Sequence, residues 1–201
     1  MIKAVLFDVD GVLSAHEPFR ERLARDHGIA ANITVPFFRG PFRDCLVGKA
    51  DLKEQLLLYL KQWGWQYTVD DFLSYWFTAE HRPNLPLLQV AQQLRQRSIH
   101  CYLATNQEQY RTAYILREMG FAARFDGAFS SAYVGYMKPE AEFFHHILHK
   151  LMPVDAGEIL FWDDTLENII AAREVGLHAE HYSDFDTCVA TMRTYFDGMP
   201  L

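Results

Sequence analysis

The sequence predicts an α/β fold in which a doubly wound parallel sheet carries a small α-helical cap. Three short apolar runs, residues 4–7, 101–104 and 159–162, each end at side chains that carry oxygen. Continuous apolar runs of this length, bounded by polar residues, are typical of strands buried on both faces of a parallel sheet. Segments with helical apolar spacing lie between the runs, and strands that alternate with helices build a doubly wound sheet.

A long interval after the first strand predicts an insertion. A strand–helix–strand unit needs only about 30 residues, whereas the first strand ends at Phe7 and the next convincing strand begins near Ile99. Helical apolar spacing over residues 87–97 predicts the crossover helix, and Pro83 and Pro86 mark its start. The expected units are a core of residues 1–14 and 85–201 and a cap of residues 15–84.

Start and stop signals divide the insertion into three expected helices. A proline or a capping Asp or Thr precedes each helix, and Gly28 and Gly64 end the first two. The segment 36–42, which contains two prolines and a glycine, is expected to be a loop. The three helices run from after Pro18 through His27, from Asp51 to about Trp63, and from Thr68 or Asp70 to about Glu80.

Helices and strands are expected to alternate through the rest of the chain, as a doubly wound sheet requires. The expected elements are a helix over 108–119, a short strand over 128–131, a helix from Glu140 to about Leu151, a strand over 158–162, a helix over 166–175, an edge strand over 179–182 and a closing helix after Asp184.

The bulk properties favour a single globular domain with an insertion. The chain has 201 residues, of which half are hydrophobic and 22% are charged. A net charge of −7 argues against a general binder of nucleic acid or of membrane surfaces, because both reward a basic face. The three cysteines lack metal-binding spacing, and the apolar run 56–60 is too short to cross a bilayer. We expect a cytoplasmic monomer or homodimer.

Polar side chains follow three of the predicted strands. Because ligands of parallel sheets bind outside the carboxyl ends of the strands, we expect these side chains to converge if the strands are neighbours. Carboxylates so close together repel one another unless a cation lies between them, so a metal and a bound phosphate are expected. The converging residues are Asp8 and Asp10, Thr105 and Asn106, and Asp163 and Asp164.

The first two of these motifs also have structural interpretations. Asp8, Asp10 and Gly11 could form an acidic turn, because Asp-Gly often ends a strand. A calcium loop is another reading, but it requires a third acidic ligand before its glycine. Thr105 could cap the next helix, with Glu108 completing a capping box, and this role is compatible with phosphate binding at the helix N-terminus.

Lys138 and the Asp163–Asp164 pair have alternatives of the same kind. A lysine at a helix start opposes the helix dipole, so capping does not explain Lys138, although a solvated surface lysine is a common alternative. Capping of the helix at Leu166 would need only one acidic residue, whereas the sequence offers two.

The four motifs around Asp8, Thr105, Lys138 and Asp163, in this order, resemble the signature of the haloacid dehalogenase-like superfamily of hydrolases. The resemblance covers nearly the whole chain. The insertion lies where the phosphatase branch of that superfamily carries a small helical cap after its first motif.

The resemblance implies a role for each polar group. Asp8 would be the nucleophile that takes up a phosphoryl group as an aspartyl-phosphate. Asp10 would protonate the leaving alcohol and then activate water as a base. Thr105, with Asn106 beside it, would bind the phosphate, and Lys138 would offset negative charge on the nucleophile and the phosphate.

Asp163 and Asp164 resemble the metal-binding pair of the same superfamily. Asp164 would bind the metal directly and Asp163 directly or through water, together with Asp8 and the main-chain carbonyl of Asp10. Asn168 would brace the pair from behind. Hard oxygen ligands and a phosphate partner favour Mg²⁺ over zinc.

Arg43, Gly48 and Lys49 are candidate substrate contacts, because caps of this superfamily use such loops for selectivity. The resemblance thus implies a Mg²⁺-dependent phosphatase of a small phosphorylated metabolite, such as a sugar phosphate or a nucleotide. A phosphomutase needs the same residues around the phosphate and stays open as an alternative. A 2-haloacid dehalogenase is less favoured, since that branch needs no Mg²⁺ and typically lacks the acid at Asp10. A non-catalytic binding module is less favoured because the motif residues are intact.

Overall fold

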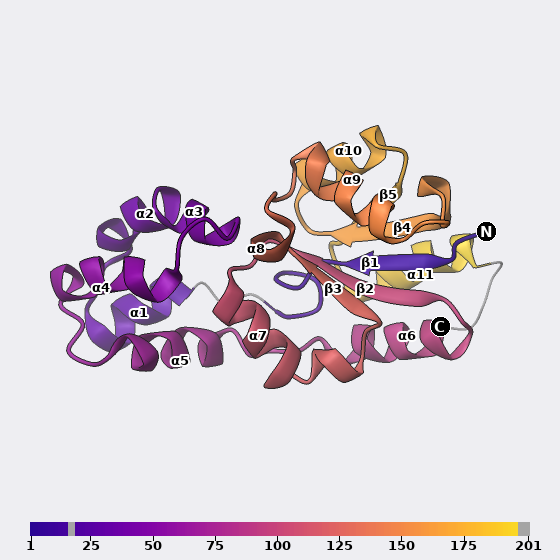
Figure 1. Cartoon of the computed structure of the whole chain (residues 1–201). Coiled ribbons are helices and arrows are strands. Elements are labelled where there is room, and N and C mark those ends of the chain that lie inside the picture. The colour runs from indigo at the N-terminus through magenta and orange to yellow at the C-terminus, as the bar shows by residue number, and fades with distance from the viewer. Residues whose placement is uncertain (16–18, 197–201) are drawn as a thin grey trace.

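The computed structural model describes residues 1–15 and 19–196 and contains a five-stranded parallel sheet (Figure 1). The strand order is β3-β2-β1-β4-β5, so the chain winds outward from β1 in both directions. This arrangement confirms the predicted doubly wound α/β fold. The strands are β1 (Ala4–Phe7), β2 (His100–Thr105), β3 (Gly127–Ser130), β4 (Ile159–Asp163) and β5 (His178–His181).

The register of the sheet aligns the strand ends that carry polar residues. Phe7 at the end of β1 lies opposite Leu103 of β2 and Trp162 of β4. All four residues of β1 are buried, as expected for a central strand covered on both faces. The polar residues after these three neighbouring strands therefore emerge at one edge of the sheet.

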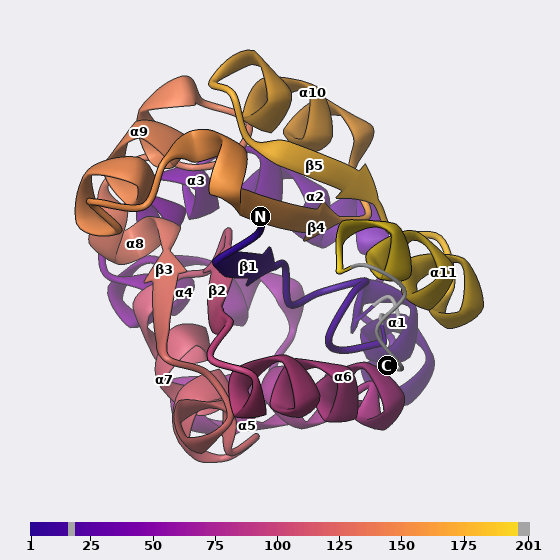
Figure 2. The same ribbon diagram turned by 90° about the vertical axis from the view of Figure 1, so that its right-hand side faces the viewer.

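Helices cover both faces of the sheet (Figure 2). Apolar side chains of three helices share one hydrophobic cluster with β1, and those of two others share a second cluster with β4. Within the described residues, no helix combines the length and apolarity needed to cross a bilayer. The first group is α6 (Leu85–Gln96), α7 (Gln109–Arg117) and α11 (Phe185–Tyr195), and the second is α9 (Ala141–Lys150) and α10 (Leu166–Glu174).

Short helical segments complete the core. They are η1 (Phe121–Ala123), α8 (Ser131–Val134) and η2 (Ala156–Glu158).

The strands and long helices that the sequence predicts for the core have boundaries within about two residues of the observed ones, which is the usual uncertainty at helix and strand ends.

Among the described residues, five helices lie between β1 and α6, and they have a hydrophobic cluster of their own, rich in aromatic side chains. They stand beyond the carboxyl ends of the strands (Figure 1). The predicted boundaries of the cap, residues 15–84, stay a proposal, and Pro18 lies outside the described residues. The cap helices are α1 (Phe19–His27), α2 (Ala31–Arg39), α3 (Phe42–Leu46), α4 (Leu52–Trp63) and α5 (Val69–Ala79).

The prediction of a loop over residues 36–42 is wrong. Pro36 lies inside α2, which ends at Gly40, and α3 begins two residues later. Phe37 is fully buried, and its ring packs against Tyr59 and Trp63 of α4. Tertiary packing of this face outweighs the cost of a proline in a short helix.

Asp51 connects the cap to the core. Its carboxylate caps α4 by accepting hydrogen bonds from the backbone N–H groups of Lys53 and Glu54, which confirms the predicted cap. The same carboxylate accepts hydrogen bonds from Gln109 Nε2 at 2.7 Å and from Tyr110 Oη at 2.6 Å, both on α7. One side chain therefore satisfies donors of both units.

We predict that Asp51→Ala lowers the free energy of unfolding by about 1–2 kcal/mol, because an N-cap and two side-chain hydrogen bonds are lost. Urea unfolding at neutral pH measures this change. Asp51→Asn is the matched control, since it keeps an oxygen acceptor for the cap and should cost less. Equal costs for the two substitutions would contradict the capping role.

The contribution of Asp51 should also depend on pH. Burial acts to raise the pKa of this carboxyl, but the hydrogen bonds from Tyr110, Glu54 and Lys53 outweigh it and lower the pKa below 3.8. A lowered pKa in the folded state means that the stabilisation is fully present above the ordinary pKa and is lost as the pH falls through the folded value. The difference between wild type and Asp51→Ala should therefore shrink in acid.

Candidate active site

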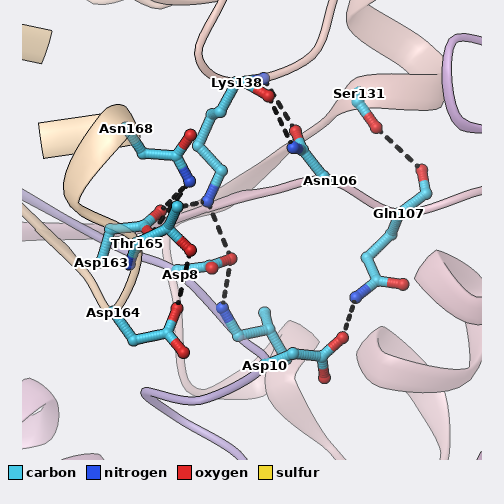
Figure 3. Close-up of polar contacts among 11 residues, drawn as sticks. Asp8, Asp10, Asn106, Gln107, Ser131, Lys138, Asp163, Asp164, Thr165 and Asn168 are labelled. Atoms are coloured by element: carbon cyan, nitrogen blue, oxygen red, sulfur yellow. Dashed lines mark hydrogen bonds and ion pairs between the residues drawn. The ribbon is translucent and has the colours of Figure 1, made fainter. Parts of the chain in front are cut away.

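A pocket of about 280 Å³ lies at the carboxyl ends of β1, β2 and β4. The side chains around it come from segments far apart in the chain, and Figure 3 shows how they face one another. Its lining includes most of the predicted polar residues, namely Asp8, Asp10, Thr105, Asn106, Lys138, Asp164 and Asn168, and adds Gly11, Gln107 and Thr165.

Lys138 lies at the centre of the charged groups. Its Nζ is 2.9 Å from Asp8 Oδ1 and 2.6 Å from Asp163 Oδ2, and its side chain is buried (Figure 3). Burial favours the neutral amine, but the two carboxylates outweigh it and raise the pKa of Lys138. The lysine is therefore a protonated cation held between two carboxylates.

Asp8 is nearly inaccessible to solvent, and this burial is the main reason that its pKa rises to about 7. The ammonium of Lys138 opposes the rise, whereas the negative charges of Asp163 and Asp10 add to it. The backbone N–H of Val9 donates a hydrogen bond of 2.7 Å to Asp8 Oδ1. Asp8 thus depends on nearby positive charge to stay ionised at neutral pH.

Asn106 holds Lys138 in position through the backbone. Its Nδ2 donates to the carbonyl of Lys138 at 2.9 Å, and its Oδ1 accepts from the Lys138 N–H at 2.8 Å (Figure 3). The amide group of Asn106, which was predicted to bind phosphate, is therefore hydrogen-bonded to the backbone of Lys138. Asn106 still lines the pocket.

Asp163 and Asp164 have different surroundings. Asp163 is fully buried, and its carboxylate accepts hydrogen bonds from Asn168 Nδ2 at 3.0 Å and from the N–H of Thr165 at 2.8 Å. Asp164 is exposed and lines the pocket. Although the residue is exposed as a whole, partial desolvation of its carboxyl group, and then the charge of Asp163, raise the pKa of Asp164.

The carboxylates of Asp8, Asp163 and Asp164 could share a metal ion. One oxygen from each lies within 4.8 Å of the others. Such a set of hard, negatively charged oxygen donors fits Mg²⁺, which is bound by carboxylates and leaves room for phosphate oxygens. Residues at the carboxyl ends of β1 and β4 therefore meet the chemical requirement for this ion.

Gly11 makes the approach of Asp164 possible. It has a φ of +83°, and a Cβ atom at this position would lie 2.1 Å from Asp164 Oδ2. Both the left-handed backbone and the close carboxylate exclude a side chain here.

Asp10 is oriented by two residues that the sequence analysis missed. Gln107 Nε2 donates to Asp10 Oδ2 at 2.5 Å, and Arg111 Nη2 lies 3.5 Å from Asp10 Oδ1 (Figure 3 shows Gln107). Hydroxyl groups of Ser130 and Ser131 donate to the carbonyl of Gln107. Gln107 could have been proposed as a site residue from the sequence, because it lies only two residues after Thr105. Arg111 could not, because in the sequence it resembles an ordinary surface residue of a helix.

Arg111 also contacts Glu80 at the end of the cap segment. The guanidinium is buried, and its Nη2 lies 3.4 Å from Glu80 Oε2. Burial, and then the charge of Asp10, raise the pKa of Glu80 to about 7, while Arg111 opposes the rise. One buried cation is therefore placed between a carboxylate of the pocket and a carboxylate of the cap segment.

The capping interpretation of Thr105 is wrong, because Glu108 is the N-cap of α7 and accepts from the N–H groups of Tyr110 and Arg111. Thr105 instead ends β2, buried at the wall of the pocket. The helix begins after Glu108, three residues beyond Thr105, and Thr105 stays in the strand.

The predicted cap contacts do not line the pocket of Asp8. Lys49 lines two neighbouring hollows, one shared with Gly48 and the other with Arg43. Gly48 lies against α8, where a Cβ atom would be 2.3 Å from the carbonyl oxygen of Ala132. In this structure Gly48 allows close contact between cap and core.

A doubly wound sheet with carboxylates, a hydroxyl and a buried lysine at one edge defines a candidate enzyme of the α/β class. A model of the haloacid dehalogenase-like hydrolase family matches residues 2–176. The chain therefore belongs to the haloacid dehalogenase-like hydrolases, as the motif order predicted.

The match to an individual relative covers less of the chain than the family model does. The chain is 37% identical over 110 residues to the sesquiterpene phosphatase astK of Aspergillus oryzae. That match covers 54% of this chain and 55% of the relative, so the chain spans about half the length of the curated relative it matches.

Two solved structures have a similar fold. One is a predicted haloacid dehalogenase-like hydrolase of Porphyromonas gingivalis, with a TM-score of 0.78, 18% identity and 98% of both chains covered. The other is a family enzyme of Bacteroides thetaiotaomicron in complex with magnesium and inorganic phosphate, with a TM-score of 0.78 and 22% identity. The second match covers 94% of this chain and 99% of that one.

We predict that Gly11→Ala destabilises the protein more than Gly64→Ala. Both glycines have a φ of +83°, but a Cβ at Gly64 meets no atom within 4 Å. The backbone strain of about 1–2 kcal/mol is common to both variants, so the excess at Gly11 measures the clash with Asp164, about 1–3 kcal/mol. Urea unfolding gives both values.

Asp164→Ala tests the origin of this excess. In that background the cost of Gly11→Ala should fall to that of Gly64→Ala, because the clashing carboxylate is absent. An unchanged excess would show that the contact with Asp164 does not restrict residue 11.

Proposed function

We propose that this protein is a Mg²⁺-dependent phosphatase that hydrolyses a small phosphorylated metabolite through an aspartyl-phosphate. The observation that carries the proposal is the position of Asp8: a buried carboxylate at a strand end, 2.9 Å from the Lys138 ammonium and beside two further carboxylates. The phosphatase among its relatives, and the family enzyme that binds magnesium and phosphate, support the same reading.

Asp8, Asp164 and the main-chain carbonyl of Asp10 would hold the Mg²⁺ ion, with Asp163 direct or through water. The bound ion supplies positive charge that offsets the charges of the carboxylates and of the phosphate oxygens. Asn168 and Thr165 hold Asp163 in a fixed orientation by the hydrogen bonds described above.

In the first step, a carboxylate oxygen of Asp8 forms a bond to phosphorus, and the bond from phosphorus to the ester oxygen breaks. Asp10 gives its proton to that oxygen, which leaves as an alcohol. Gln107 orients the Asp10 carboxyl by its hydrogen bond. Lys138 and the hydroxyl of Thr105 stabilise negative charge on the phosphoryl group.

In the second step, Asp10 is a carboxylate and takes a proton from water. The water oxygen bonds to phosphorus, and the bond from phosphorus to Asp8 breaks, which releases inorganic phosphate and restores both carboxyl groups. Asn106 supports both steps by holding the backbone of Lys138.

Arg43, Gly48 and Lys49 line hollows at the boundary of cap and core, and we propose them as contacts with larger parts of a substrate. The cytoplasm is the proposed location. Cys45, Cys101 and Cys188 are buried free thiols, the state that reducing compartments maintain.

Replacement of the nucleophile tests the covalent scheme. We predict that Asp8→Asn lowers Mg²⁺-dependent phosphate release about a thousandfold or more, because the amide cannot attack phosphorus. A panel of phosphate esters, assayed with Mg²⁺ and with EDTA, gives the measurement. Asp186→Asn makes the same chemical change on the exposed face of α11 and should retain activity.

Two outcomes of this assay, and one of a parallel assay with a haloacid, would contradict the proposal. Retained activity in Asp8→Asn would exclude the aspartyl-phosphate. Release of an isomerised ester in place of phosphate would indicate a mutase, and release of halide from a haloacid without metal would indicate a dehalogenase.

Asp10→Asn tests the acid and base roles separately. Nitrophenolate leaves without a proton, so with p-nitrophenyl phosphate the first step should survive and the second should not. We predict a stoichiometric burst of nitrophenolate followed by slow turnover. With an alkyl phosphate the first step itself should slow by about 10²–10⁴-fold. Rapid-quench kinetics distinguish these results, and equal slowing with no burst would contradict the assignment.

A further inference from the structure

The cap contains an apolar hollow of about 260 Å³ that the proposed chemistry does not use. Its walls come from helices α1, α2, α3 and α5, which stand beyond the carboxyl ends of the strands (Figure 1). Two of its wall residues, Arg20 and Glu80, are charged. The others are Phe19, Phe38, Phe42, Leu46 and Trp76.

The aromatic rings form a continuous wall. The ring of Trp76 stacks on Phe19 at 5.2 Å between centroids and meets the edges or tilted faces of Phe38 at 5.3 Å and Phe42 at 5.7 Å. These contacts fix the rings before any ligand arrives. Phe38, Phe42 and Leu46 are only partly buried, so apolar surface beyond what the cap core covers faces the hollow.

This chemistry contrasts with that of the pocket at Asp8, where nearly every wall residue is polar or charged. Aromatic walls with few polar groups are typical of sites for apolar ligands. A sugar in the hollow would leave most of its hydroxyl groups without partners, because two of the seven wall residues are charged and one of these, Glu80, is already paired with Arg111.

The apolar hollow and the catalytic pocket are linked by one guanidinium group. Glu80 is a wall residue of the hollow, Asp10 is a wall residue of the pocket, and Arg111 Nη2 lies 3.4 Å from the first and 3.5 Å from the second. Under the proposed mechanism, Asp10 protonates the ester oxygen. The organic group attached to that oxygen therefore starts beside Asp10, on the side of the pocket where Arg111 contacts Glu80.

We propose that the hollow binds the organic group of the substrate, and that the substrate is a phosphate monoester of a largely apolar alcohol. A cavity of 150 Å³ holds benzene, so about 260 Å³ accommodates about ten carbon atoms. The proposal rests on the proposed phosphatase function and names the substrate class. It replaces the sugar phosphate or nucleotide considered from the sequence.

The test compares two esters, 3,7-dimethyloctyl phosphate and glucose 6-phosphate, and the matching phosphonates, which cannot be hydrolysed. We expect kcat/KM to be about tenfold or more higher for the apolar ester, and the apolar phosphonate to bind correspondingly tighter by calorimetry with Mg²⁺ present. Equal values for the two esters and for the two phosphonates would overturn the proposal.

Substitutions of two leucine residues test whether this hollow causes the preference for the apolar ester. Leu46→Asn places an amide in the wall and should reduce the preference about tenfold, through KM and phosphonate affinity. Leu57→Asn makes the same change on the exposed face of α4 and should leave the preference intact. Leu46→Met should restore it, and urea unfolding verifies that each variant is folded. An unchanged preference in Leu46→Asn would overturn the assignment of this hollow.

The test distinguishes failure of the apolar-substrate proposal from failure of the proposed phosphatase function. Phosphate release from both esters at equal rates would refute the apolar substrate and leave the phosphatase function standing. No phosphate release from either ester, with the phosphonate preference present in wild type and lost in Leu46→Asn, would refute the phosphatase function and leave the apolar site standing.

Discussion

The ammonium of Lys138 lies 2.9 Å from Asp8 and 2.6 Å from Asp163, in a position that solvent barely reaches. Removing such charges from water costs several kcal/mol for each ion, and only close, well-oriented partners offset that cost. The surrounding polar residues hold this geometry, with Asn106 on the lysine backbone and Asn168 on the Asp163 carboxylate. The pocket can therefore be negatively charged, partly dry and still stable.

Adjacency of β1 and β4 brings these charges together. The order β3-β2-β1-β4-β5 sets the ends of the first and fourth strands side by side, although about 150 residues separate Asp8 from Asp163 in the chain. Gly11 then allows the carboxylate of Asp164 to come closer than any side chain at residue 11 would permit. The concentration of negative charge that favours a divalent cation thus follows from strand order and from one glycine.

The cap adds the opposite chemistry. Its five helices bury a cluster of aromatic and aliphatic side chains and leave an apolar hollow on the side of Glu80. Arg111 lies between Glu80 of this hollow and Asp10 of the polar pocket, where a charged phosphate would bind. A buried cation at this boundary offsets part of the repulsion between the carboxylates of Asp10 and Glu80. We infer that the core binds the phosphate group of the substrate and that the cap binds its apolar organic group.

The sequence by itself determined the strands, the capping of α4 by Asp51, and the family, and the structure selects Thr68 over Asp70 as the cap of α5. These follow from local patterns: continuous apolar runs, residues that accept hydrogen bonds from a free helix end, and motifs in a fixed order. Only the tertiary structure decided that Pro36 lies in a helix, that Arg111 is buried, that Glu108 and not Thr105 caps α7, and that the cap aromatics enclose a hollow. Each of these depends on contacts between segments distant in the chain, and their packing energy outweighs the local preferences from which a sequence is read.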